Sequence, residues 1–378
     1  MRVEVKPKLL RWACERARID IQALSVRFPQ LMLWEKGETQ PTLNQIEHFA
    51  KAVHVPVGYL FLNEPPVEQL PIPDFRTIGN EYIQRPSPDL LETIYLCQQR
   101  QEWYRDFTIS MKGTGCSFVG AASVTDSTMA VASDIRKTLG FDIEARRQMS
   151  TWQEALRHFI EQADELGLLV MVNGVVGSNN KRKLAPSEFR GFVLADKFAP
   201  LIFINGSDTK SAQMFTLAHE LAHVWLGETG ISDIEPFYVT NKTEEWCNQV
   251  AAELLAPLEI IHDEYKIKDD VNDEIVRLAR YFKVSTLVII RRIYDANFIT
   301  KDEFKTIYYD ELNRLMDMPR GSGGNFYLTQ AARVGKRFSR ALMISTLEGQ
   351  TLHRDAFRLL GFSKFETFRE LGHSLGVA

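Results

Sequence analysis

One stretch, residues 215–227 with the sequence FTLAHELAHVWLG, constrains this chain more than any other. Its apolar spacing predicts a helix on which His219 and His223, four residues apart, project from one face. Glu220 follows about 100° round the same helix. Two imidazoles so placed can hold a zinc ion, and the neighbouring carboxylate can serve as general base toward a water at that ion. The alternative is two histidines on a buried helix.

A third ligand is expected in residues 244–257, EEWCNQVAAELLAP, which predict a second helix ended by Pro257. Glu244 and Asn248 stand four residues apart and share a face, so the carboxylate can reach the metal while the amide holds a ligand imidazole. We prefer Glu244 to Glu245 for this reason. A pair of surface carboxylates is the alternative.

The two motifs together, HELAH and then ExxxNxxAAELLxP, resemble the ImmA/IrrE family of zinc metallopeptidases, whose fold is similar to the minimal core of gluzincin proteases. The resemblance implies a Zn²⁺ cofactor held by His219, His223 and Glu244. It implies that Glu220 is the catalytic base. It also implies a phage or mobile-element context, in which such proteins cleave or otherwise inactivate a transcriptional repressor.

The composition is that of an ordinary globular protein, with 45% hydrophobic and 25% charged residues. A length of 378 residues allows two or three domains. The net charge of −4 argues against a polybasic protein, so any nucleic-acid contact depends on local patches. The first residues lack the pattern of a signal peptide, and the longest apolar run is too interrupted to span a membrane. We therefore expect a cytoplasmic protein without a membrane partner.

The four cysteines are scattered without a C-x-x-C pair, at Cys14, Cys97, Cys116 and Cys247. This spacing indicates neither a disulfide framework nor a cysteine zinc site, and it fits a reducing compartment. Cys247 falls on the predicted ligand-bearing helix, where we interpret it as a small buried residue.

The N-terminal region, residues 7–62, predicts five short helices. Its segment WEKGETQPTLNQIEHFAKAVHVP resembles the Cro/C1-type (XRE) helix-turn-helix. The resemblance implies operator DNA binding by the helix near residues 30–36, with Gln30 and Lys36 as candidate contacts. That helix offers mainly apolar side chains, which leaves base readout open. Nine basic and six acidic residues give residues 1–60 a charge of +3, and protein docking or dimerisation is the alternative role.

A proline-rich linker follows the predicted helix-turn-helix domain, which we assign to residues 1–62. Residues 63–73, NEPPVEQLPIP, contain four prolines and cannot continue a helix. The next four residues, DFRT, resemble a segment seen in helix-turn-helix fusions of the same family. A loop anchored by Phe75 is our default interpretation of it, and we place the whole linker at residues 63–87.

The following region, residues 88–265, is assigned to the peptidase core. Long amphipathic patterns predict helices, and short apolar runs then predict strands of a small sheet. The helices are expected over 88–112, 125–139 and 151–166, and the strands over 168–172, 189–194 and 200–205. The chain is therefore expected to have a helix-rich α+β fold.

Three features of this core bear on substrate binding. In zinc peptidases of this type the strand before the active helix offers its edge to the substrate backbone, and LIFIN, residues 201–205, is the best candidate. The basic loop at residues 177–186 is either a mobile rim or a plain solvated turn. Tyr238 is a candidate donor to the oxyanion of the tetrahedral intermediate, although nothing in the sequence fixes its direction.

The C-terminal part divides into a helical subdomain at residues 266–319 and a basic extension at 320–378. Residues 278–299 look like a second helix-turn-helix, with Ser285 as a helix cap. A helix over residues 327–347 would carry a basic stripe formed by Arg333, Lys336, Arg337 and Arg340. Eight basic and two acidic residues over 320–364 give a charge of +6, which suits DNA phosphates or an acidic partner. A solvated helix face is the alternative.

These predictions combine into a zinc-dependent metallo-endopeptidase that acts on a regulatory protein of the repressor or antitoxin type. Its helix-turn-helix domain would couple it to transcriptional regulation, with operator DNA and a toxin as further candidate partners and oligomerisation left open. The alternative is a non-proteolytic DNA-binding regulator or toxin–antitoxin component in which the zinc site is structural.

Overall fold

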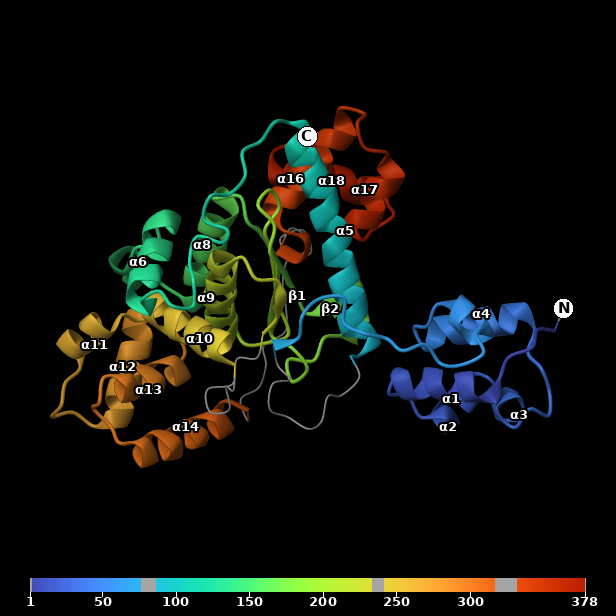
Figure 1. Ribbon diagram of the computed structural model, residues 1–378, viewed down its shortest axis with the longest axis horizontal. Coiled ribbons are helices and arrows are strands. Elements are labelled where there is room, and N and C mark those ends of the chain that lie inside the picture. The colour runs from blue at the N-terminus through green and yellow to red at the C-terminus, as the bar shows by residue number, and fades with distance from the viewer. Residues whose placement is uncertain (1, 76–85, 233–240, 317–331, 378) are drawn as a thin grey trace. The chain divides into compact units, whose positions relative to one another are not determined.

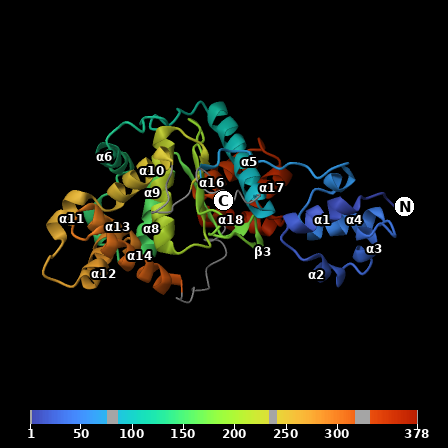
Figure 2. The ribbon, with the colours of Figure 1, turned by 60° about the horizontal axis from the view of Figure 1, so that its bottom comes forward.

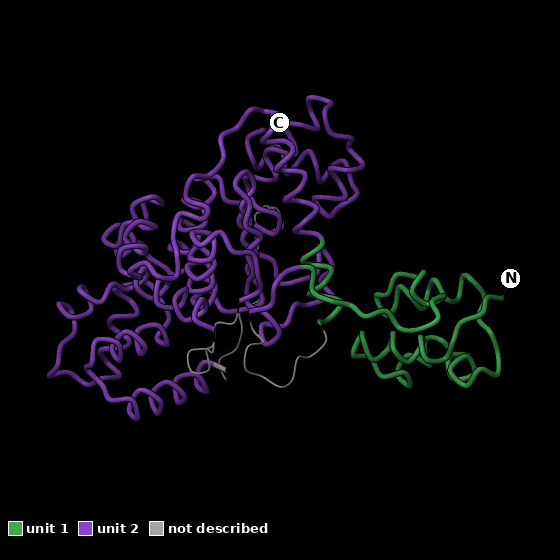
Figure 3. The backbone as a smooth tube through the Cα atoms, viewed as in Figure 1, with its two compact units in different colours: residues 1–71, 80–95 green, residues 72–79, 96–378 purple. Residues whose placement is uncertain are grey.

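The structure is a computed structural model that describes residues 2–75, 86–232, 241–316 and 332–377. The chain forms two compact units, drawn in different colours in Figure 3. Unit 1 comprises residues 1–71 and 80–95, and unit 2 comprises residues 72–79 and 96–378. Their division falls inside the predicted linker and inside the first long helix after it.

The five short helices predicted for unit 1 are present. They are α1 (Pro7–Arg16), α2 (Ile21–Ser25), α3 (Leu31–Glu35), α4 (Leu43–Ala52) and η1 (Val57–Phe61), the last being a 3₁₀ helix. Helix α4 begins with a reciprocal capping box between Thr42 and Gln45. In α3, Leu31 and Trp34 are buried, so this short helix uses its apolar residues in the core.

Unit 2 contains a four-stranded mixed sheet with the strand order β1-β5-β4-β6. The strands are β1 (Leu169–Asn173), β4 (Gly191–Leu194), β5 (Leu201–Asn205) and β6 (Gly230–Ile231). Strand β5 pairs in parallel with β1 and antiparallel with β4, which in turn pairs antiparallel with β6. The first three strands agree with the predicted runs.

The prediction that LIFIN is an edge strand is wrong. Its residues form β5, which is hydrogen-bonded on both sides and buried at every position. A strand with two paired edges has no free backbone groups to offer to a substrate peptide.

The basic loop predicted over residues 177–186 is also different in the structure. It contains β3 (Asn179–Lys183), which pairs antiparallel with β2 (Val175–Val176) in a separate two-stranded sheet. Polar and charged residues have low strand propensity, which hid this exposed strand from the pattern. The segment is therefore a hairpin.

Helices cover both faces of the larger sheet, as Figure 1 shows. Helix α9 (Lys210–Leu226) packs on β4 and β5, and α8 (Trp152–Glu165) packs on β1. Helix α16 (Lys336–Leu347) lies against β1 as well, on the side of the sheet where α5 (Pro88–Ser110) runs. The apolar core of unit 2 joins this sheet to α9 and its neighbours.

A cluster of further helices in unit 2 contacts α9 through α10. They are α6 (Thr128–Leu139), α7 (Ile143–Arg147), α10 (Lys242–Leu255), α11 (Leu258–Glu264), α12 (Val271–Phe282), α13 (Thr286–Asp295) and α14 (Lys301–Met316). The expected turn between α12 and α13 is present, with Lys283 at φ +52° and Ser285 accepting a hydrogen bond from the Val288 N–H. This subdomain therefore has the predicted local helical pattern.

The C-terminal residues form α16, α17 (His353–Leu360) and α18 (Phe365–Leu375). The prediction of one helix over residues 327–347 is wrong, because Gly335 adopts φ +80° and α16 begins after it. Residues 327–331 of that prediction lie outside the described part of the chain. Among the described helices, none has an apolar stretch long enough to cross a membrane.

Candidate metal centre

Helix α9 carries two histidines and a glutamate into the interior of unit 2. It begins after Thr209, whose side chain accepts a hydrogen bond from the first turn, and it ends at Gly227, where φ is +72°. Glycine adopts this left-handed conformation without the cost that a Cβ imposes. His219 and Glu220 are 0% exposed and His223 is 1% exposed. Polar side chains buried this completely need partners.

Helix α10 supplies one such partner. It begins after Asn241, whose side chain caps the Thr243 N–H, and it packs beside α9, as Figures 1 and 2 show. Glu244 lies in its first turn and is buried, whereas the next residue, Glu245, is exposed. Cys247 is buried in the apolar core. Of the two adjacent carboxylates, Glu244 is therefore the one that faces α9.

The three side chains bring one ligand atom each to a common point. The Nε2 atom of His219 lies 3.2 Å from His223 Nε2 and 3.2 Å from Glu244 Oε2. His223 Nε2 lies 2.9 Å from Glu244 Oε1. Ligands held tetrahedrally at about 2.0–2.1 Å from a zinc ion are about 3.3 Å apart. The donor atoms and their spacing therefore fit a metal ion, and three protein ligands leave a coordination position open.

Asn248 stands one turn after Glu244 and fixes the orientation of the first histidine. Its Oδ1 lies 3.0 Å from His219 Nδ1. A carboxamide oxygen only accepts hydrogen bonds, so this contact places the imidazole proton on Nδ1 and leaves Nε2 as a lone-pair donor. The arrangement is the one that the spacing of Glu244 and Asn248 on a helix predicts.

Glu220 lies between the sheet and the other three side chains. Ser232, directly after β6, donates a hydrogen bond of 3.1 Å to Glu220 Oε2. Among the described residues, Glu220 Oε1 has no hydrogen-bond partner. A Cβ on Gly191 in β4 would come within 2.8 Å of that oxygen, so glycine is what allows the carboxylate to lie against the strand. One oxygen is therefore held, and the other is available to a ligand or water.

The electrostatics of the four groups differ sharply. Burial raises the pKa of Glu220 to about 8, and the charge of Glu244 adds to that rise. Burial also opposes ionisation of Glu244, but the two imidazoles hold its pKa at about 2. Burial would lower the pKa of both histidines, yet Glu244 raises that of His219, while that of His223 stays lowered. Of the two carboxylates, Glu244 is therefore much the more acidic.

Phe75 reaches the metal centre from the linker, where it is the last described residue before position 86. Its ring stacks on the His223 ring, with centroids 5.4 Å apart and planes at 3°. A Cβ on Gly230 would lie 2.2 Å from Phe75 Cε2, so the ring also rests directly on β6. The expected anchoring role of Phe75 in DFRT therefore has a specific location, although Arg76 and Thr77 lie outside the described residues.

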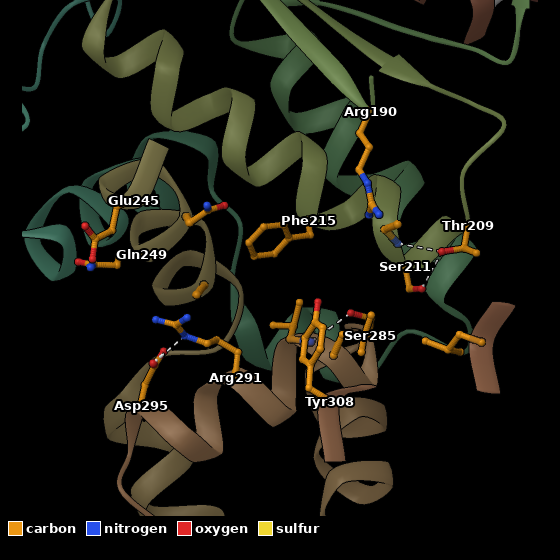
Figure 4. A pocket seen from close by; sticks show the side chains of 16 residues that line it. Arg190, Thr209, Ser211, Phe215, Glu245, Gln249, Ser285, Arg291, Asp295 and Tyr308 are labelled. Carbon is orange, nitrogen blue, oxygen red and sulfur yellow. Dashed lines mark hydrogen bonds and ion pairs between the residues drawn. The ribbon is translucent and has the colours of Figure 1, made fainter. Parts of the chain in front are cut away.

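A cavity of about 290 Å³ is lined in part by Asn248 and lies between α9, α10, α13 and α14. Figure 4 shows Phe215 and Tyr308 reaching into it from α9 and α14, and the ion pair between Arg291 and Asp295 at its margin. Phe215 stands one helical turn before His219. The cavity therefore begins within about one turn of the ligand-bearing part of α9.

Gln30 and Lys36 belong to unit 1, where they are exposed at the two ends of α3. Tyr238 falls outside the described residues, so its proposed oxyanion role has no structural description.

The predicted basic stripe is largely engaged within unit 2. Arg333 donates to Asn180, Lys336 to Glu161, and Arg337 to Asp164 and Tyr104, while Arg340 is exposed. Gly335 separates Arg333 from the helix that carries the other three. The four residues therefore do not form one continuous helical stripe.

The sequence analysis did not identify Ser232 or Gly191 as parts of the site. It named Phe75 as the anchor of a loop but did not predict its contact with His223. Ser232 stands outside any helical repeat, and its contact with Glu220 depends on how β6 pairs with β4. Gly191 had a weak signal, since a glycine at a strand end marks a close approach of another group.

Comparison with known proteins adds one decisive observation. Residues 163–294 match a peptidase family. The family is Peptidase_M78, described as the IrrE N-terminal-like domain, and the match contains His219, Glu220, His223 and Glu244. Residues 334–374 match a domain of unknown function, DUF8813. No curated protein and no solved structure matches the chain.

The peptidase match and the buried cluster agree with each other. The matched family implies a metal cofactor, and the matched residues 163–294 contain the buried cluster of His219, His223 and Glu244. Neither match includes unit 1. Its helix-turn-helix identity therefore remains a prediction from the sequence.

Proposed function

We propose that this protein is a zinc-dependent metallo-endopeptidase. The observation that carries the proposal is the buried set of His219, His223 and Glu244, with Glu220 directly beside it on α9. Three protein ligands with an open position are typical of catalytic zinc sites, whereas structural sites are closed by four. When bound, zinc would polarise the scissile carbonyl and the attacking water.

The residues of the chain would then handle the proton. Glu220 accepts the proton of the attacking water and passes it to the leaving amine, so one carboxylate serves both steps. Ser232 holds Oε2 by a hydrogen bond and leaves Oε1 for the water. Asn248 keeps the proton of His219 on Nδ1, so that its Nε2 stays available as a ligand. His219, Glu220, His223 and Glu244 are all buried. Their burial excludes bulk water, which strengthens the interactions among them.

The test of catalysis is Glu220→Gln, with Glu245→Gln on the exposed side of α10 as the matched control. We expect Glu220→Gln to retain its metal and to lose about 10²–10⁴-fold in cleavage rate, because the amide cannot accept the proton. The measurement is the rate of peptide-bond cleavage in a proteome-derived peptide library, together with metal content. Equal cleavage by wild type and Glu220→Gln would eliminate Glu220 as the base.

We further propose that the substrate is a regulatory protein of the repressor or antitoxin type, and that the N-terminal helices couple cleavage to transcription. The resemblance of both regions to regulatory proteins supports this. The test compares new protein N-termini in cells that produce wild type or Glu220→Gln. We expect the difference to lie among DNA-binding regulators. If Glu220→Gln keeps the cellular function and deletion of residues 1–62 abolishes it, the protein acts as a non-proteolytic regulator.

A further inference from the structure

The chain itself fills the edge of the sheet that lies next to the metal centre. Beyond β6, Asp74 forms a parallel bridge with Ile231, and the Ile231 N–H donates a hydrogen bond of 3.0 Å to the Pro73 carbonyl. Strand β6 pairs with β4 on its other side. Within the described part of unit 2, residues 73–75 are therefore the outermost segment at this edge.

This edge leads directly to the candidate catalytic groups. Ser232, the residue after β6, bonds to Glu220, and Gly191, at the start of β4, lies against the same carboxylate. A peptide that added a strand beyond β6 would run past Glu220 with its backbone paired. The segment 73–75 lies where that peptide would have to lie.

Phe75 is the side chain by which this segment contacts the centre. Its ring stacks on His223 and rests on Gly230, where any larger residue would collide with it. An aromatic ring over the face of an imidazole gains both apolar contact and favourable stacking. The surface formed by His223 and Gly230 is thus shaped for a flat aromatic group.

The attachment is also slight enough to be reversed. Ile72 is buried, but Pro73 is exposed and both Asp74 and Phe75 are only half-buried. The backbone pairing with β6 is short, since it consists of the bridge between Asp74 and Ile231 and includes the bond from the Ile231 N–H to the Pro73 carbonyl. A peptide able to pair with β6 over a longer stretch would make more such bonds and could take its place.

We infer that residues 73–75 are an internal competitor for the peptide-binding edge of β6, and that the place of Phe75 is a subsite for an aromatic side chain of the substrate. The inference rests on the proposed function, because it assigns the substrate of that same centre. An extended peptide with an aromatic residue must displace the segment to reach Glu220. The segment lies outside the residues that match the peptidase family, so this competition is a property of the longer chain.

The test uses the full chain loaded with Co²⁺, whose visible spectrum reports ligand binding at the metal. Two probes are titrated: phenylalanine hydroxamate, which carries an aromatic ring, and acetohydroxamate, which does not. In Phe75→Ala we expect phenylalanine hydroxamate to bind about tenfold more tightly, because the competing state is removed. Acetohydroxamate should change less. Phe365→Ala, an exposed aromatic position on α18, is the control and should change neither affinity.

Hydrogen exchange at the Ile231 amide gives a readout that does not depend on activity or on metal. Its bond to Pro73 should open more often in Phe75→Ala, so that exchange becomes faster, while Phe365→Ala exchanges as wild type does. Phe75→Leu keeps apolar bulk and guards against loss of folding; it should fall between wild type and Phe75→Ala. Unchanged exchange and unchanged hydroxamate affinities in Phe75→Ala would overturn the inference.

Gly230→Ala tests separately whether residues 73–75 compete for the edge and whether the place of Phe75 is an aromatic subsite. The added Cβ should expel Phe75, which speeds exchange at Ile231, but it should also obstruct an aromatic probe. We therefore expect faster exchange without the gain for phenylalanine hydroxamate. A full gain in that variant would refute the aromatic subsite. If instead these shifts occur but no peptide is cleaved by any variant, the proposed peptidase function fails while the competition stands.

Discussion

Helix α10 carries two buried carboxylates, Glu244 and Glu253, whose surroundings differ. Near its start, Glu244 meets two imidazoles, and near its end, Glu253 meets the guanidinium of Arg292. Both carboxylates are almost fully buried, at 1% and 4% exposure. The difference lies in what surrounds them, because the second cluster is complete and the first is not.

The Glu253 cluster satisfies its groups within the protein. Arg292 also donates to the Ala256 carbonyl at 2.7 Å and pairs with Asp295, while Glu253 accepts from the Leu258 N–H. At the metal centre, by contrast, Glu220 Oε1 has no hydrogen-bond partner among the described residues. A buried charge that is fully paired holds the fold together, whereas convergent donors left with spare capacity await a ligand. This contrast separates a structural cluster from a functional one on the same helix.

The largest effect expected from this comparison is on stability. Arg292→Leu leaves Glu253 as a buried carboxylate without its cation, which should lower the free energy of unfolding by about 3–5 kcal/mol. Arg291→Leu is the matched control, because Arg291 is one-third exposed and its pair with Asp295 should contribute only about 0–1 kcal/mol. Denaturant titration measures both. Equal losses of unfolding free energy in the two variants would show that the Glu253 pair is no more important for stability than the exposed Arg291 pair.

A smaller effect is expected on metal affinity. Asn248→Ala removes the acceptor that orients His219, and such outer contacts typically change metal affinity about 10–100-fold. The exposed neighbour Gln249 provides the control as Gln249→Ala. Competition with a chromogenic chelator gives the affinities. No change in Asn248→Ala would mean that this hydrogen bond does not position the ligand.

Asp164 on α8 lies between these two cases, because only one of its carboxylate oxygens is bonded. Its substitution should give the smallest effect, which is on the pH dependence of stability. Its Oδ2 accepts from the Arg337 N–H, but Oδ1 has no partner among the described residues, and burial raises its pKa from 3.8 to about 6. Because the folded state holds this proton more tightly than the unfolded state, stability falls as pH rises from about 4 to 6. Asp164→Asn should lack that fall and be about 1–2 kcal/mol more stable at pH 7.5. Parallel curves from pH 4 to 7.5 would contradict the assignment.

The parts of the structure that follow from local periodicity could be predicted. Residues four apart share a helix face, so the pairs His219 with His223 and Glu244 with Asn248 follow from spacing alone. The apolar runs likewise located β1, β4 and β5 within about two residues.

Strand order and long-range contacts could not be read in the same way. Nothing local in residues 201–205 distinguishes a central strand from an edge strand, because the distinction depends on which strands pair on either side. The place of Phe75 depends on pairing between the linker and β6, which are far apart in the chain. Gly335 was a local warning, since a glycine inside a helical pattern often ends the helix.

The central claim is that Glu244, and not its neighbour, completes a metal centre with His219 and His223. Its most direct test is the zinc content of purified wild type, His219→Ala, Glu244→Ala and Glu245→Ala after equilibration with a limiting chelator. We expect wild type and Glu245→Ala to retain one equivalent of zinc and the other two variants to lose it. Full occupancy in Glu244→Ala would contradict the account.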